Sequence, residues 1–292
     1  MSGNNALVEK ILNTPKPLSD DQKKAVLSEA RYNRIIAGAG AGKTETITRR
    51  IAYLLAVKEV APSEIVAFTF TEKAAQSMKS RVYQRVGEIC GEKATVNLGE
   101  MYIGTIHAYA KRVLEDQFRF GNYGVLDDNQ EIAFLMRQGW SLGLHTQGWS
   151  PKNFSNFLKT VNMAWDELLD EQELHKRAPD FYHKMKKYED ILKQNRLLTF
   201  GTIIYKAVLK LREAPDTLSK VKHLLVDEYQ DINKAQAELI EYIGRNAEIF
   251  VVGDPRQSIY QWRGSDERFF SKFTEKYPDA LPISIKENRR SG

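Results

Sequence analysis

The chain has 292 residues, of which 28% are charged and 42% hydrophobic, so it is long enough for a large core and we expect two domains. Its single cysteine, Cys90, excludes a disulfide framework and a cysteine-based metal site, and it indicates a reducing, cytoplasmic setting. We find no signal-peptide pattern and no apolar run long enough to span a bilayer, so no membrane partner is expected. The net charge of +5 suits a polyanionic partner.

Two segments precede the first expected strand. Residues 1–16 form either a short helix or a partly ordered arm, which Pro15 and Pro17 punctuate. Ser19 is then a suitable N-cap for a second helix. Gln22 lies in that helix, and its amide can donate and accept hydrogen bonds at once, which fits the edge of an adenine base. Most glutamines at such positions only face solvent, so this interpretation depends on the motif that follows.

The stretch AGAGAGKT, residues 37–44, follows an apolar strand pattern and precedes an amphipathic helix pattern. Strand, loop of small residues, Gly-Lys-Thr and helix is the order that a phosphate-binding P-loop requires. Backbone N–H groups of such a loop close around phosphate oxygens, and the positive end of the helix dipole points at the same anion. Lys43 is expected to reach the β- and γ-phosphates, and Thr44 to hold Mg²⁺. The loop itself consists of Ala37, Gly38, Ala39, Gly40, Ala41 and Gly42.

The strict P-loop pattern begins with glycine, where this chain has Ala37. The alternative is an ordinary turn of small residues before a helix. The position of the Gly-Lys-Thr between a strand pattern and a helix pattern favours the P-loop.

Strands and helices then alternate. A strand is expected at residues 65–71 and a helix at 72–86, with one buried face formed by Ala74, Ala75, Met78 and Val82. A further strand ends near residue 104, and a helix starts near 107. From about 116 to 197 the strand signals fade, and helical patterns occupy 129–142, 151–169 and 180–197.

A helix at 200–211 leads back to strand patterns at 223–233, 248–254 and 281–286. The alternation predicts an α/β fold, with a parallel sheet flanked by helices. We expect this sheet domain to comprise residues 1–115 and 198–292, and an all-helical subdomain to be inserted at 116–197. Ligands of such sheets bind at the carboxyl ends of the strands.

The segment LLVDE, residues 224–228, is an apolar strand that ends in two adjacent carboxylates. Alone, it could equally be a strand end capped by solvated acids. After a P-loop it is the Walker B arrangement, in which Asp227 contacts Mg²⁺ through water because that ion dehydrates reluctantly. Glu228 is then expected to orient and deprotonate the attacking water.

A second polar segment, GDPRQSIYQWRGS, occupies residues 253–265. Gln257 follows a buried strand and can hydrogen-bond a γ-phosphate and a polar neighbour together. Tyr260, Trp262 and Arg263 come next, and aromatic rings beside an arginine offer flat faces to bases and charge to phosphates. The alternative is that the tyrosine and the tryptophan are core residues.

Together these segments resemble the superfamily I DNA helicases of the UvrD/Rep/PcrA type. Seven stretches occur in that family's motif order: LSDDQKKAV, AGAGAGKT, AFTFTEKAA, GTIHAYAKRVL, VDEYQD, VGDPRQSIYQWRGS and IKENRRS. The family's P-loop usually starts with alanine, so Ala37 fits it. The resemblance implies a RecA-like domain that uses ATP and Mg²⁺ and moves 3′ to 5′ on single-stranded or duplex-junction DNA.

The resemblance also implies roles for single residues. Gln22 would read adenine, and four residues would bind and hydrolyse MgATP: Lys43, Thr44, Asp227 and Glu228. Gln257 and Arg290 would sense the γ-phosphate. Contact with single-stranded DNA, or its coupling to the nucleotide site, would involve Thr69, Phe70, Thr105, His107, Tyr260, Trp262 and Arg263. Its place in GTIH is the only reason to include His107.

Two positions depart from the family pattern. Arg289 stands where the family usually has a tyrosine, and Glu45 stands where some members carry an arginine near the base. Both bear on adenine selectivity, although a guanidinium can still stack on adenine.

The family continues past its motif IV into a second RecA-like domain with motifs V and VI, whereas this sequence ends at Gly292. The expectation is therefore a first motor half that binds MgATP, hydrolyses it slowly and unwinds nothing alone. A nucleotide-gated DNA-binding module and the motor half of a helicase–nuclease remain as alternatives. The preference for DNA over RNA rests on the resemblance alone. DNA repair is one candidate pathway, and the sequence indicates no oligomeric state.

Overall fold

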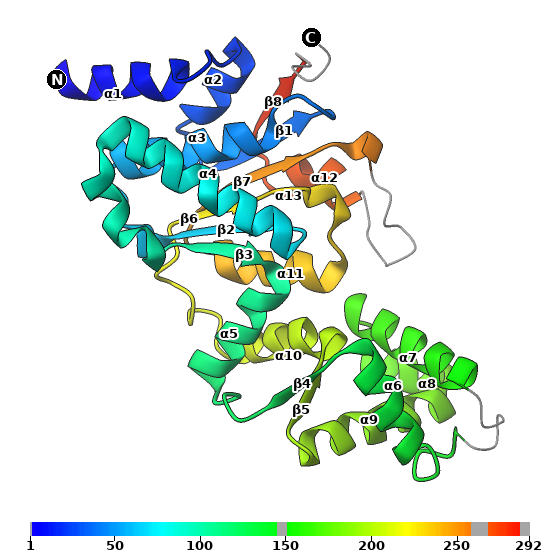
Figure 1. The fold of residues 1–292 in the computed structure, drawn as a ribbon. Coiled ribbons are helices and arrows are strands. Elements are labelled where there is room, and N and C mark those ends of the chain that lie inside the picture. Colours follow the sequence, from blue (N-terminus) through cyan, green and yellow to red (C-terminus); the bar gives the residue numbers. More distant parts are fainter. Residues whose placement is uncertain (1, 145–150, 258–267, 287–292) are drawn as a thin grey trace. The chain divides into compact units, whose positions relative to one another are not determined.

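A computed structural model describes residues 2–144, 151–257 and 268–286 (Figure 1). The chain divides into two compact units. The first consists of Met1–Ile106, Leu218–Ile232 and Ile240–Gly292, and the second of His107–Thr217 and Asn233–Leu239. Residues 107–115 and 198–217, which we expected in the sheet domain, belong to the second unit. For the second of these ranges the reason is that helix α10 (Phe200–Glu213) packs on helix α7 (Pro151–Asp166).

The first unit contains a six-stranded, all-parallel sheet with the order β3-β2-β6-β7-β1-β8. Its strands are β1 (Tyr32–Ala37), β2 (Ile65–Thr69), β3 (Tyr102–Thr105), β6 (His223–Val226), β7 (Glu248–Gly253) and β8 (Leu281–Ile285). Three of the central strands, β2, β6 and β7, are almost entirely buried, as expected when helices cover both faces, whereas buried and half-buried residues alternate along β1. The predicted α/β fold and parallel sheet are confirmed. All carboxyl ends of the strands lie at one edge, which the site occupies.

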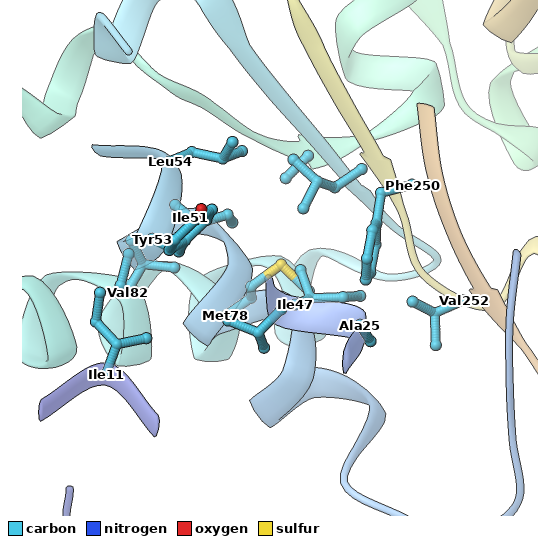
Figure 2. Packing of buried hydrophobic residues seen from close by; sticks show 14 of the residues in the cluster. Ile11, Ala25, Ile47, Ile51, Tyr53, Leu54, Met78, Val82, Phe250 and Val252 are labelled. Atoms are coloured by element: carbon cyan, nitrogen blue, oxygen red, sulfur yellow. The ribbon is translucent and has the colours of Figure 1, made fainter. Parts of the chain in front are cut away.

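One face of the sheet is covered by α2 (Asp20–Val26), α3 (Lys43–Ala56) and α4 (Glu72–Cys90), and α1 (Ser2–Asn13) packs on α3 and α4. Figure 2 shows the packing of this layer, with Ile47 of α3 and Met78 of α4 close to Phe250 of β7. The next residue toward the start of that strand, Ile249, points the other way and meets Gly244 at the end of α11 (Lys234–Gly244). Ala74, expected on the buried face of α4, is exposed, whereas the other three residues of that stripe are buried.

Arg49 of α3 holds the N-terminal segment against that helix. Its guanidinium is only 1% exposed and donates to the carbonyl oxygens of Ile11 and, at 3.1 Å, Lys16. Its Nε donates to the Glu45 carboxylate at 2.6 Å, and Arg85 reaches the same carboxylate at 3.3 Å. A buried charge is tolerated when it is paired and fully hydrogen-bonded, as here. Of the two alternatives for the N-terminal segment, the helix is confirmed.

The second unit is helical apart from a two-stranded parallel sheet that the sequence did not predict, β4 (Gly124–Leu126) with β5 (Leu197–Thr199). Besides α7 and α10 its helices are α5 (Ile106–Phe118), α6 (Asp128–Gln138), α8 (Glu171–Arg177) and α9 (Pro179–Gln194). Trp165 and Tyr188 stack at its centre with ring centroids 6.3 Å apart. The tyrosine hydroxyl donates to Glu131 at 2.9 Å, and the indole N–H donates to Glu189 at 2.8 Å.

Short helical segments complete the described chain: η1 (Pro62–Glu64), η2 (Glu92–Glu100), η4 (Tyr229–Asp231), η5 (Pro255–Gln257), α12 (Arg268–Ser271) and α13 (Phe273–Lys276). Over the described residues, none of the helices is both long and apolar enough to cross a lipid bilayer.

Candidate nucleotide and nucleic-acid sites

The loop between β1 and α3 has the geometry of an anion cradle. Gly40 and Gly42 have φ angles of 77° and 79°, in the left-handed region that glycine adopts without strain. The helix begins at Lys43, and its N-cap Gly42 supplies no side-chain cap, so the first-turn N–H groups are free to bind a ligand. A Cβ on Gly42 would lie 2.7 Å from the Gln22 Nε2 atom, so the position has no room for a side chain.

Gln22 joins helix α2 to this loop. It is 1% exposed, and its Nε2 donates to the Ala41 carbonyl oxygen at 3.1 Å. Its Oε1 accepts from the Ser19 backbone N–H at 3.0 Å, and the Ser19 hydroxyl accepts from the Gln22 backbone N–H at 3.3 Å, which completes the predicted N-cap. One amide hydrogen and one lone pair remain for a base. The adenine-reading role stays a prediction.

Lys43 is paired with Glu228 across the site. The distance from Nζ to Oε2 is 2.5 Å, and the two side chains are 11% and 33% exposed. Glu228 has φ and ψ of 51° and 41°, a left-handed conformation that costs a non-glycine residue about 1–3 kcal/mol and is typical of functional sites. The backbone thus holds this carboxylate against the lysine of the cradle.

Asp227 follows β6 directly, and its Oδ1 accepts from the Glu228 backbone N–H at 3.0 Å. Burial and the charge of Glu228 together raise its pKa to about 7, although Lys43 offsets part of this effect. A nearby cation would favour the charged carboxylate, so the position suits a metal ion. Its oxygens and the hydroxyl of Thr44 are the hard ligands that Mg²⁺ prefers.

Among the described residues no group of three or more His, Cys, Asp or Glu side chains could hold a metal. Mg²⁺ bound with phosphate needs only one or two protein carboxylates, since water and phosphate complete its coordination. The donor set therefore fits Mg²⁺ better than a metal that needs a full protein cage.

Gln230 links the acids after β6 to the end of β7, and sequence reasoning missed it. The side chain is 1% exposed, and its Nε2 donates to Glu228 at 2.9 Å and to Asp231 at 3.0 Å. Its Oε1 accepts from the Asp254 backbone N–H at 3.0 Å. The Asp254 carboxylate in turn accepts from the Gln257 Nε2 at 2.5 Å, so the predicted γ-phosphate sensor is tied to the same group.

Three of the residues expected to contact DNA lie at the carboxyl ends of the neighbouring strands β2 and β3. Thr69 is 3% exposed, and its hydroxyl donates to the Thr71 carbonyl oxygen at 3.1 Å. Phe70 follows it and is half-buried. Thr105, which is paired in register with Thr69, donates to Glu72 at 2.8 Å.

His107 belongs to the second unit, where its ring meets that of Phe200 edge to face at 5.8 Å. Burial lowers the pKa of the imidazole to about 4, so it is neutral at physiological pH. Phe200 is 49% exposed although it is a large aromatic side chain. An exposed aromatic ring at the start of a helix is a candidate stacking face for a base, and sequence reasoning missed it.

Five of the predicted residues lie outside the described part of the chain: Tyr260, Trp262, Arg263, Arg289 and Arg290. Their roles stay predictions. Glu45 is described, and its arginine partners hold the pKa of its carboxyl below the ordinary value although burial acts in the opposite direction.

The family model and the individual relatives that match this chain all point to one family. Residues 18–278 match the family described as UvrD/REP helicase N-terminal domain. The chain is 35% identical over 290 residues to the ATP-dependent DNA helicase PcrA of Staphylococcus epidermidis and 34% identical over 290 residues to that of Bacillus subtilis. It is 34% identical over 302 residues to the ATP-dependent DNA helicase UvrD1 of Mycobacterium bovis. Each alignment covers 94% of this chain but only 37% or 38% of the relative.

Proposed function

Because this chain belongs to the UvrD/REP helicase N-terminal domain family, we propose that it is the ATP-binding motor part of a DNA helicase that moves 3′ to 5′ on single-stranded DNA. One observation carries the proposal: the glycine cradle, Asp227 and Glu228, and the Gln257 turn all lie at the carboxyl edge of one parallel sheet. A cleft at that edge is where open α/β sheets bind ligands.

In the proposed site the backbone N–H groups of the loop and of the first turn of α3 bind the triphosphate. Lys43 leaves Glu228 and contacts the β- and γ-phosphates. Thr44 and Asp227 hold Mg²⁺, which neutralises phosphate charge when it is bound. Glu228, released from the lysine, orients a water molecule and accepts its proton. Gln257 senses the γ-phosphate.

For the nucleic acid we propose aromatic stacking. Phe200 offers an exposed ring in the second unit, and the predicted Tyr260 and Trp262 would add further faces. Each stacked base would contribute about 1–3 kcal/mol. Stacking alone does not distinguish DNA from RNA, so the substrate class rests on family membership.

Turnover by the chain alone is expected to be slow. An arginine finger raises the rate of related nucleotide hydrolases by about 10³–10⁵-fold, and in this family motif VI would supply such a group. Motif VI is not among the seven stretches of this sequence.

The test is nucleotide binding by the purified chain, measured by calorimetry with MgATP. Lys43→Ala should weaken binding at least about tenfold, equivalent to about 1.4 kcal/mol. The matched control is Lys58→Ala, which removes a lysine just beyond the same helix that is paired with Glu29 at 2.6 Å. Equal MgATP affinity in wild type and Lys43→Ala would remove the P-loop assignment and the motor proposal with it.

A further inference from the structure

A continuous chain of hydrogen bonds runs from the P-loop lysine to the turn after β7. Lys43 contacts Glu228, Glu228 accepts from Gln230, and Gln230 accepts from the Asp254 backbone. Asp254 accepts from the Gln257 side chain, and its Oδ1 accepts from the Arg256 backbone N–H at 3.0 Å. All of these residues belong to the first unit. Gln230 is therefore the only described link of this chain that bonds to both the β6 end and the β7 end.

We propose that Gln230 is a positioning residue that couples the state of the nucleotide site to the Gln257 turn. This inference rests on the proposed function, because it needs MgATP to take Lys43 away from Glu228. Both Nε2 hydrogens of Gln230 lie on carboxylates, those of Glu228 and Asp231. When the ammonium leaves, the Nε2 hydrogen on Glu228 is the described donor that this carboxylate keeps, so the amide follows the carboxylate as it turns toward the phosphates.

Tight packing prevents that motion from being absorbed locally. A Cβ on Gly253 would lie 2.6 Å from the Gln230 Oε1 atom and 3.3 Å from the Phe270 ring. The amide therefore lies directly against the backbone at the end of β7. A shift of the amide must move the Gly253–Asp254 peptide, to which its oxygen is bonded, and the turn that begins there. Packed interiors transmit small displacements in this way because they have little free volume.

The chemistry of the residue supports this role over a purely structural one. Any hydrogen-bond donor could bridge the Glu228 and Asp231 carboxylates. Only a primary amide can donate to both of them and also accept a hydrogen bond from a backbone N–H. Glutamate at this position would keep the length and the acceptor for Asp254 and lose the pair of donors. Methionine would keep the length and approximate volume and lose all three bonds.

The experiment measures coupling in the purified chain. The affinity for a labelled oligothymidylate is determined by fluorescence anisotropy with and without a non-hydrolysable MgATP analogue, and the analogue affinity is determined by calorimetry. Wild type should show at least a fivefold change in DNA affinity caused by the analogue, since coupling between sites is typically about 5–150-fold. In Gln230→Glu and Gln230→Met the change should fall to less than about twofold, a ratio taken from the two DNA affinities of the same variant and therefore independent of its basal affinity.

The matched control is Gln236→Glu. Gln236 is also buried, and its Oε1 accepts from the Asn233 backbone N–H at 3.1 Å, so the substitution keeps its one side-chain bond and should leave the coupling unchanged. Thermal melting identifies any variant that does not fold. If one of the two Gln230 variants fails to fold, the coupling measured in the other variant tests the inference. Wild-type coupling in a folded Gln230 variant, or no coupling in wild type that binds both ligands, would overturn the inference alone. Failure of wild type to bind the analogue would overturn the proposed function as well.

Discussion

Replacing Glu228 by glutamine should tighten the binding of MgATP while it removes hydrolysis. In the structure the Lys43 ammonium is paired with the Glu228 carboxylate at 2.5 Å. The triphosphate must compete with this carboxylate for the lysine. Glutamine keeps the size of the side chain and an oxygen acceptor, but it replaces an ion pair by a neutral hydrogen bond. The lysine is then easier to recruit, and the general base is lost.

The magnitude follows from the burial of the pair. Two unit charges about 4 Å apart near a protein surface attract by about 4 kcal/mol, whereas fully exposed pairs contribute only about 0.2–1 kcal/mol in measurements. Lys43 is 11% and Glu228 33% exposed, so solvent screens the pair in part. A net cost between these limits, about 1–2 kcal/mol, corresponds to about 5–30-fold tighter binding of MgATP in the variant.

Calorimetric titration of the purified chain with MgATP measures this difference, and phosphate release measures turnover. Glu248→Gln is the matched control, because that carboxylate is 39% exposed and pairs with Arg50 at 3.3 Å at the opposite end of the sheet. It should leave the MgATP affinity unchanged. Affinity equal to or weaker than wild type in a folded Glu228→Gln protein would refute the idea that the carboxylate competes with the nucleotide for Lys43.

Three further outcomes are expected. Gly42→Ala should lower the free energy of unfolding by about 1–2 kcal/mol in denaturant titrations, because φ is 79° and the new methyl group meets Gln22. Gly121→Ala is the control, because a Cβ there has nothing within 4 Å, and equal effects of the two substitutions would contradict the strain at Gly42. Phe200→Ala should weaken oligothymidylate binding about 5-fold or more, whereas Leu169→Ala, 46% exposed in the same unit, should leave it unchanged; no loss in the first would exclude stacking there. Burial raises the pKa of Glu131 to about 7, so the folded state holds an extra proton and wild-type stability falls as pH rises from about 4.5 to about 7. Glu131→Gln keeps the acceptor for Tyr188, so its stability relative to wild type should increase across that pH range in thermal melts, and a constant difference would refute the assigned shift.

The proposed nucleotide site could be predicted from the sequence because each of its parts is a short local motif. Each part is recognisable within a few residues: the loop of small residues, the Lys-Thr pair, and the strand that ends in two carboxylates. A parallel sheet then brings the separate segments to one edge without further information. Family resemblance supplied the roles, and the family match confirms the class of protein.

The remaining features depend on tertiary contacts that spacing does not encode. Gln230 stands within a recognised motif, yet its partners at Asp254 and Gly253 are fixed only by the register of β6 beside β7. Phe200 is in phase with the buried stripe of its helix, so periodicity predicts burial, but it is the first residue of α10 and remains half exposed. The strands β4 and β5 have three residues each, too few for an alternating pattern to be detected.

The bonds that Arg49 makes to Ile11 and Lys16 have a practical consequence for anyone preparing this protein. A shortened version that starts at Leu18 would delete two acceptors of the Arg49 guanidinium and leave the Glu45 carboxylate as its remaining described acceptor. Such a truncation would disturb helix α3, which begins at Lys43, the lysine proposed to bind phosphate. Purification tags at this terminus therefore belong ahead of an intact first helix, and weak ATP binding by a trimmed protein would report on lost anchoring and not on the cradle.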